Sequence, residues 1–255
     1  MKARYKELLD RAIAAMVAAI DVYNKPDFPY RAESFAILAI NSWELLLKAK
    51  WLADNANNIR CLHVYEPVTL KDGSTGKRKK VKTTRSGNPF THSLNHLGNK
   101  LVEKKTLDSL AWKNLVALEE LRDSTIHFYH SSPKFAELLQ EIGAATLKNF
   151  TAAIFEWFGR DLSKFNFYLM PLSFVPLQTP SEVIVLNKEE TKFFRYIQSL
   201  EPAELDPISR YSVTVNFEVR FIRSTAKDVL SVKVTNNPDA FQIRLTEEQI
   251  RDKYP

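Results

Sequence analysis

The sequence predicts an α+β protein: an all-helical bundle that carries a small β-hairpin, followed by a smaller mixed unit. Three observations lead to this prediction. Over residues 3–158, apolar side chains recur every three to four positions in five segments, which is the period of an α-helix. Between about 60 and 91 the period changes to two, on either side of a turn. Beyond 166 short alternating segments predominate, so we expect a bundle over 1–165 and an α+β unit over 166–255.

The first two predicted helices differ in how much of their surface is apolar. Residues 3–23 form an amphipathic pattern that ends before Pro26. Residues 31–57 carry large apolar side chains around most of the helix, among them Phe35 and Trp43. A helix that is apolar on nearly every side is normally buried, so we expect this one at the centre of the bundle.

Start and stop signals predict the remaining helices of the bundle. A third helix follows Thr91 as its N-cap and covers about 92–105, and a fourth covers about 108–127. The fifth begins near Pro133, which is acceptable in a first helical turn, and continues to 158, with Gly159 just past its end.

The predicted second unit combines strands with one helix. Residues 211–221 alternate strictly between apolar and polar side chains, which indicates a half-buried strand. Further strands are expected at 183–186, 229–234 and 241–245, and a helix at about 188–200. A capping-box pattern begins at Thr246, only two turns before the sequence ends, so we expect the natural chain to continue past Pro255.

Composition excludes several classes of protein. No apolar run approaches the roughly 18 residues that span a bilayer, and the charged, amphipathic N-terminus lacks the apolar core of a signal peptide. The single Cys61 excludes an internal disulfide framework, and we expect it to be a small buried residue rather than a nucleophile. These features predict a cytoplasmic protein that does not bind membranes.

The net charge of +6 is concentrated in the predicted hairpin. Residues 60–91 contain eight basic and two acidic residues, so the rest of the chain is neutral on balance. Such a protrusion is typical of a surface that contacts phosphate groups. The alternative is a solubilising protrusion, since Tyr65 is its main aromatic residue for stacking on bases. The candidate phosphate contacts are Lys77, Arg78, Lys79, Lys80, Lys82 and Arg85.

Arg122 interrupts the apolar stripe of the fourth predicted helix, in register with Leu115 and Leu118. An unpaired guanidinium in a core is costly, so Arg122 is expected to meet a carboxylate, a polar cleft or a bound anion. A structural ion pair with Glu44 or another acid is the plain alternative.

Asp123 precedes His127 by four residues, which places both on one helical face, where the carboxylate can orient the imidazole. Arg122 and His127 are five positions apart, or about 140° around an ideal helix. They flank one site only if the helix frays or a second protomer supplies the facing half. His130 is a further candidate.

Three polar residues form a stripe on the otherwise apolar second helix: Asn41, Glu44 and Lys48. Polar groups in such a helix need partners. They mark either the solvent edge of the helix or a polar pocket shared with Arg122.

A helical bundle with Arg122 and His127 late in its fourth helix resembles the HEPN superfamily, whose ribonucleases carry an arginine and, after four to six residues, a histidine. The chain is also similar, over nearly its whole length, to a narrower uncharacterised bacterial HEPN-like family. The segments that carry this second resemblance are NKPDFPYR at 24–31, ESFAIL at 33–38, WELLLKAK at 43–50, RSGNP at 85–89 and RLTEE at 244–248.

The resemblance implies RNA cleavage without a metal ion or cofactor, in a homodimer whose two arginine-histidine motifs face one cleft. The catalytic residues are then Arg122 and His127, with Asp123 orienting and Asn41, Glu44 and Lys48 supporting. The implied partners are RNA, with tRNA among the candidates, and an antitoxin or phage-defence component. The alternative is a non-catalytic module that binds nucleic acid or protein, as some HEPN-like domains do.

Two other histidine patterns carry less weight. Arg85 and His92 have a spacing similar to that of Arg122 and His127, but they straddle a Gly-Pro turn, which at most binds an anion. His92 and His96 stand at i and i+4, as metal ligands do, without a local carboxylate or cysteine to complete a site. We therefore interpret them as a solvated or core pair and predict no metal site.

Overall fold

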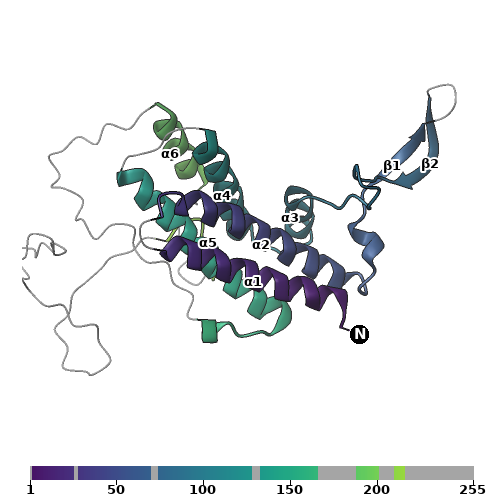
Figure 1. Cartoon of the computed structure of the whole chain (residues 1–255), viewed down its shortest axis with the longest axis horizontal. Helices are drawn as coiled ribbons and strands as arrows, with labels where there is room; N and C mark the ends of the chain where they lie inside the picture. The colour runs from purple at the N-terminus through teal and green to yellow at the C-terminus, as the bar shows by residue number, and fades with distance from the viewer. Residues whose placement is uncertain are drawn as a thin grey trace, which may run out of the picture.

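The computed structural model describes residues 2–25, 28–69, 74–127, 133–165, 188–200 and 210–215, and within them the side chains of all but 124–127, 133–137 and 188–189 (Figure 1). The described part is mostly helical with one two-stranded antiparallel sheet, so the predicted α+β class is confirmed at this level. Its α-helices are α1 (Arg4–Asn24), α2 (Arg31–Asp54), α3 (Leu94–Glu103), α4 (Ser109–His127), α5 (Pro133–Phe158) and α6 (Lys188–Leu200). The short elements are η1 (Ile59–Leu62), β1 (Tyr65–Thr69), β2 (Thr75–Val81) and η2 (Ser163–Phe165).

Helix α2 is the central helix, as its apolar surface predicts, and it contacts α1, α3, α4 and α5. Its Trp43 is fully buried and meets Phe150 of α5 edge to face, with 5.5 Å between ring centroids. Helices α1 and α2 lie side by side along their length (Figure 1). Small residues such as Ala12 allow this close approach, and Ser42 of α2 donates a 2.7 Å hydrogen bond to the Ala12 carbonyl.

Most predicted helix ends are confirmed within a few residues. Helix α5 ends at Phe158 because Gly159 adopts a φ of +61°, and the Gly159 amide donates to the Phe155 carbonyl at 2.8 Å. The predicted N-cap of α3 is wrong. Ser93, not Thr91, caps α3, since the Ser93 hydroxyl accepts from the His96 amide at 3.3 Å. Thr91 lies two residues earlier and forms an antiparallel bridge with His63.

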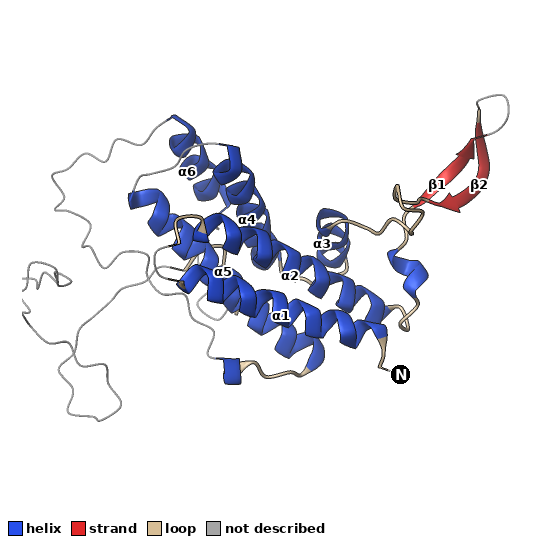
Figure 2. Cartoon of the chain, viewed as in Figure 1, coloured by secondary structure: helices blue, strands red, loops and turns tan. Residues whose placement is uncertain are grey.

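The predicted hairpin is confirmed and projects away from the bundle (Figure 2). Tyr65 pairs with Val81 across the two strands. A further turn follows at Gly87, whose φ of +82° suits glycine. The turn returns the chain so that the Val64, Lys82 and Phe90 backbones bond to one another at 2.7–2.9 Å. The hairpin therefore rests on a base of three chain segments that are joined by backbone hydrogen bonds.

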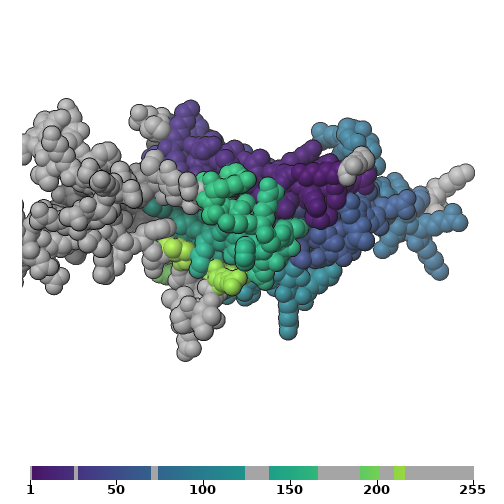
Figure 3. Space-filling view, turned by 90° about the horizontal axis from the view of Figure 1, so that it is seen from below, coloured from purple at the N-terminus to yellow at the C-terminus, as the bar shows by residue number. Residues whose placement is uncertain are grey.

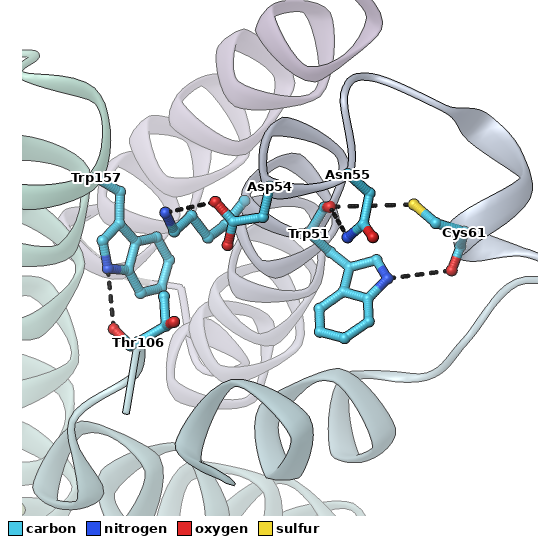
Figure 4. A network of polar contacts seen from close by, with 7 residues as sticks. Trp51, Asp54, Asn55, Cys61, Thr106 and Trp157 are labelled. Atoms are coloured by element: carbon cyan, nitrogen blue, oxygen red, sulfur yellow. Dashed lines mark hydrogen bonds and ion pairs between the residues drawn. The ribbon is translucent and has the colours of Figure 1, made fainter. Parts of the chain in front are cut away.

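The C-terminal end of α2 anchors this base (Figure 4). The Trp51 indole donates to the Cys61 carbonyl at 3.1 Å, and the Asn55 side chain donates to the Trp51 carbonyl at 2.7 Å. Lys104 lies over the Trp51 ring, 4.1 Å from its centroid. Cys61 is partly rather than fully buried, and this burial raises the pKa of its thiol, so the thiol is not an activated nucleophile.

Residues 210–215 lie against α5 and are not a strand, so the strand prediction is wrong for this part of 211–221. Their hydrogen-bond partners are side chains and one helix carbonyl: the Val215 amide donates to the Glu141 carbonyl of α5 at 3.2 Å. Asn149 accepts from the Ser212 amide at 3.0 Å and donates to the Ser212 carbonyl at 2.7 Å, and the buried Asn114 donates to the Val213 carbonyl at 2.8 Å. Figure 3 shows this segment in yellow-green beside the green surface of α5.

Helix α6 also packs on the bundle, where Phe193 and Ile197 join the hydrophobic core. The division of the chain near 165 remains a prediction. The other strands predicted in this half, the remainder of 211–221 and the last helix lie outside the described residues. Within the described residues, no helix is long and apolar enough to cross a bilayer.

Candidate functional site

Arg122 lies in the last two turns of α4, in helical register with the fully buried Leu115 and Leu118, but its side chain is 28% exposed. The predicted core position is therefore wrong: the guanidinium reaches the rim of the bundle. The long side chain can follow the apolar stripe with its methylene groups and still place its charge near water. Nε donates to Asp123 Oδ1 at 2.8 Å, and Nη2 lies 2.8 Å from the same oxygen and 3.9 Å from Glu119 Oε1.

Asp123 contacts Arg122, although the sequence pattern predicts that it orients His127. Its side chain is 59% exposed, so water reaches this ion pair. His127 is the last residue of α4, and its side chain and the whole of His130 lie outside the description. Because α4 is helical through His127, positions 122 and 127 stand about 140° apart around one axis. The helix therefore does not fray before His127, and the second protomer stays a prediction.

The polar stripe of α2 has its own partners. Lys48 Nζ donates to Glu44 Oε1 at 2.6 Å and to Thr91 Oγ1 at 3.0 Å, with its side chain 15% exposed. Glu44 therefore pairs with Lys48, and the plain alternative of a structural ion pair for Arg122 is confirmed with other acids, Asp123 and Glu119. Asn41 is exposed and marks the solvent edge of the helix. The structure thus brings Glu44 and Lys48 together without Arg122.

The first turn of α3 connects these two groups through residues that the sequence interpretation missed. On one side, Thr91 binds Lys48. On the other, Asn95 Nδ2 donates to Glu119 Oε1, the carboxylate beside Arg122, at 3.2 Å. We call this row the α3 polar surface; it comprises Glu44, Lys48, Thr91, His92, Asn95, His96, Glu119, Arg122 and Asp123.

His92 and His96 stack at the centre of this row, with ring centroids 4.0 Å apart and ring planes 10° from parallel. Their i, i+4 spacing was the one sequence signal for this part of the surface. Burial, the neighbouring His96 ring and the Lys48 ammonium together lower the pKa of His92. The His92 imidazole is therefore neutral at pH 7.

The predicted phosphate contacts of the hairpin are accessible. Lys77, Arg78, Lys79, Lys80, Lys82 and Arg85 are all exposed. Lys80 lies 3.4 Å from Glu66, an exposed pair of little energetic consequence. Lys82 lies over the ring of Phe90, 4.9 Å from its centroid, and Phe90 and Tyr65 are both exposed. The hairpin therefore presents Phe90 as a second exposed aromatic ring beside Tyr65, the main one in the sequence interpretation.

In the part of the chain that the structure describes, no three His, Cys, Asp or Glu side chains gather as metal ligands do. The stacked His92 and His96 therefore lack a third ligand among these residues.

The fold and surface define a class: a helical bundle with a projecting basic hairpin and a polar surface at the foot of that hairpin. Residues 7–203 match the family described as a domain of unknown function (DUF3644), and the chain belongs to this family. The match includes all six described α-helices and the hairpin. No curated protein and no solved structure matches the chain.

Proposed function

We propose that this protein is a metal-independent RNA endonuclease of the HEPN type, with Arg122 and His127 as its catalytic residues. The main support for this proposal is the position of Arg122. Its guanidinium is held at the rim of the core with one edge on Asp123, a carboxylate that is itself 59% exposed. Because a solvated ion pair is weak, a phosphate can replace Asp123 at the same two N–H groups.

The proposed chemistry uses the ribose 2′-hydroxyl as nucleophile. His127 takes the 2′-OH proton, O2′ attacks phosphorus, and the bond from phosphorus to O5′ breaks as a water molecule donates a proton to O5′. Arg122 stabilises the phosphorane with paired hydrogen bonds. The products are a 2′,3′-cyclic phosphate and a 5′-hydroxyl, so the substrate is RNA. Asp123, once released from Arg122, is four positions from His127 and would orient its imidazole.

The proposal includes a homodimer. Since positions 122 and 127 diverge by about 140° on α4, Arg122 of one protomer would act with His127 of its partner. The hairpin cations would hold the RNA backbone, and Glu44, Lys48 and Asn41 would line the approach to the site. Cleavage of tRNA, a role as toxin or phage-defence effector, and an antitoxin or defence-system partner rest on the resemblance to HEPN proteins alone.

A second candidate is a non-catalytic module that binds nucleic acid or protein. One observation favours it: Arg122 already has two carboxylate neighbours, Asp123 and Glu119, as a purely structural arginine would. Under this alternative the hairpin still binds RNA, but the RNA stays intact.

The test is to incubate the protein with tRNA and total RNA in EDTA, beside Arg122→Ala and His127→Ala. Arg160→Ala is the matched control, because Arg160 also pairs with an aspartate, Asp10, at a different place on the bundle. We expect cleavage by the wild type and the control, and none by either site variant.

Mixing the two inactive variants under conditions of subunit exchange should restore part of the activity, because some mixed dimers contain one intact composite site. Cleavage that persists in both single variants would remove this site from the reaction. An absence of cleavage by every form would favour the binding module.

A further inference from the structure

A second cluster of basic groups lies at the foot of the hairpin, away from the Arg122 guanidinium. It consists of Lys48 from α2 and the stacked rings of His92 and His96 at the start of α3. The proposed reaction uses none of these three side chains chemically.

The backbone holds this cluster in place from both sides. The His92 amide donates to the Leu62 carbonyl at 2.9 Å, which joins the start of α3 to the hairpin base. Lys48 is held by Glu44 and by Thr91, the residue before His92. The Lys48 ammonium and the His92 imidazole are therefore both positioned by the segment that contains Thr91 and His92. Most of the Lys48 side chain is already buried.

The electrostatics of the cluster favour an anion. The two neighbours that act on His92, the His96 ring and the Lys48 ammonium, both disfavour its protonation. Glu44 is the carboxylate that pairs with the Lys48 ammonium, and its side chain is 35% exposed. An anion bound against these groups would raise the pKa of His92 and so favour the protonated imidazole. The protonated imidazole then donates a charge-assisted hydrogen bond to the anion.

The location indicates which anion. The segment that leads from β2 to His92 carries the exposed Lys82 and Arg85, and it returns to the bundle beside Phe90. A nucleic acid that runs down the hairpin along these cations arrives at His92 with a phosphate group.

We propose that Lys48, His92 and His96 form a phosphate-binding site for one phosphodiester of an RNA strand whose backbone the hairpin holds. This inference rests on the proposed RNA substrate but not on cleavage. The site positions RNA and takes no part in bond breaking.

The test uses a 2′-O-methyl RNA oligomer, which lacks the nucleophile and stays intact. The Cε1–H resonance of His92 is followed by NMR from pH 5 to 8, with and without the oligomer. We expect the apparent pKa of His92 to rise in the complex. Affinity for the oligomer should fall about tenfold in the double variant His92→Gln, His96→Gln, as expected for the loss of a charge-assisted hydrogen bond.

His63→Gln is the control, because His63 lies at the same hairpin base and is bridged to Thr91 only through its backbone. Its affinity should stay within about twofold of the wild type, a difference small on the scale of one interaction. An unchanged His92 pKa in the complex, or no binding of the oligomer, overturns the site. A wild type that shows the pKa rise but cuts no RNA would end the endonuclease proposal and leave this inference standing.

Discussion

At the scale of single residues, the proposed activity depends on how the Arg122 guanidinium is held. Nε donates to Asp123 Oδ1, and Nη2 lies 2.8 Å from the same oxygen. These two nitrogens form the edge of a guanidinium that can bind a phosphate with two parallel bonds. The register of Arg122 with Leu115 and Leu118 can be read from the sequence. Its exposure cannot, because exposure depends on where the neighbouring helices stop covering α4.

Arg122→Lys should lower the rate of RNA cleavage at least about tenfold, since an ammonium keeps the charge but cannot form two parallel hydrogen bonds. Single-turnover cleavage of a labelled RNA gives the rate. Arg160→Lys serves as the control and should leave the rate unchanged, because Arg160 pairs with Asp10, outside the proposed site. Equal rates for Arg122→Lys and the wild type would argue that Arg122 has no paired contact with the phosphate.

His92 should make the fold less stable in acid. Its pKa is lowered in the folded state from its ordinary value of 6.5 by burial, His96 and Lys48, so the unfolded chain binds the proton more readily. The resulting loss of unfolding free energy is absent above pH 6.5 and grows as the pH falls through that value. It is complete below the folded-state pKa of His92. Urea unfolding at pH 7.5 and pH 5 should show a smaller acid loss for His92→Gln than for the wild type. An identical loss would mean that His92 titrates normally.

At the scale of elements, helix limits could be predicted well and side-chain partners between elements could not. Pro133 and Gly159 define α5 by local backbone preferences, which are properties of the sequence itself. The cap of α3 was misplaced by two residues because Thr91 and Ser93 are both good caps, and the bridge from His63 to Thr91 decides between them. The irregular path of 210–215 depends on Asn149, some 60 residues earlier in the chain.

The contact between α3 and α4 gives a prediction at this scale. An added Cβ at the buried Gly98 would come within 3.0 Å of the Trp112 ring, so Gly98→Ala requires that the Trp112 ring shift or that the two helices separate. We expect a loss of roughly 2 kcal/mol in unfolding free energy despite the better helix propensity of alanine.

The exposed Asn99→Ala, on the same helix, should be neutral or slightly stabilising. Urea titration measures both variants. A Gly98→Ala protein as stable as the wild type would show that Trp112 can move away at no cost.

At the scale of the whole molecule, charge and shape separate two parts: a balanced bundle and a basic projection (Figure 2). The distribution of charge along the sequence predicts this separation, since residues 60–91 carry the net charge of the chain. The α3 polar surface could not be predicted, because its contacts join residues of different segments: Lys48 of α2 binds Thr91, and Asn95 of α3 binds Glu119 of α4. A sequence pattern reports neighbours along one helix, whereas this surface is made of neighbours across helices.

Neutralising three hairpin cations, Lys77, Arg78 and Lys79, to glutamine should reduce the slope of log affinity for single-stranded RNA against log salt by roughly 2. The matched control neutralises three exposed cations of α1: Arg4, Lys6 and Arg11. It should leave the slope nearly unchanged, and thermal stability should be similar in both triple variants. Equal slope changes would mean that RNA contacts the protein without preference for the hairpin.

The central claim is cleavage of RNA by its own 2′-hydroxyl at a site made of Arg122 and His127. The most direct measurement compares, in EDTA, the products formed from an RNA and from the same RNA with a single 2′-deoxy substitution at the cleaved nucleotide, with wild type, Arg122→Ala and His127→Ala. The account predicts that the wild type cuts only the unsubstituted RNA, leaving a 2′,3′-cyclic phosphate, and that neither variant cuts. Cleavage at the 2′-deoxy position, a 3′-hydroxyl product, or undiminished cutting by either variant would contradict it.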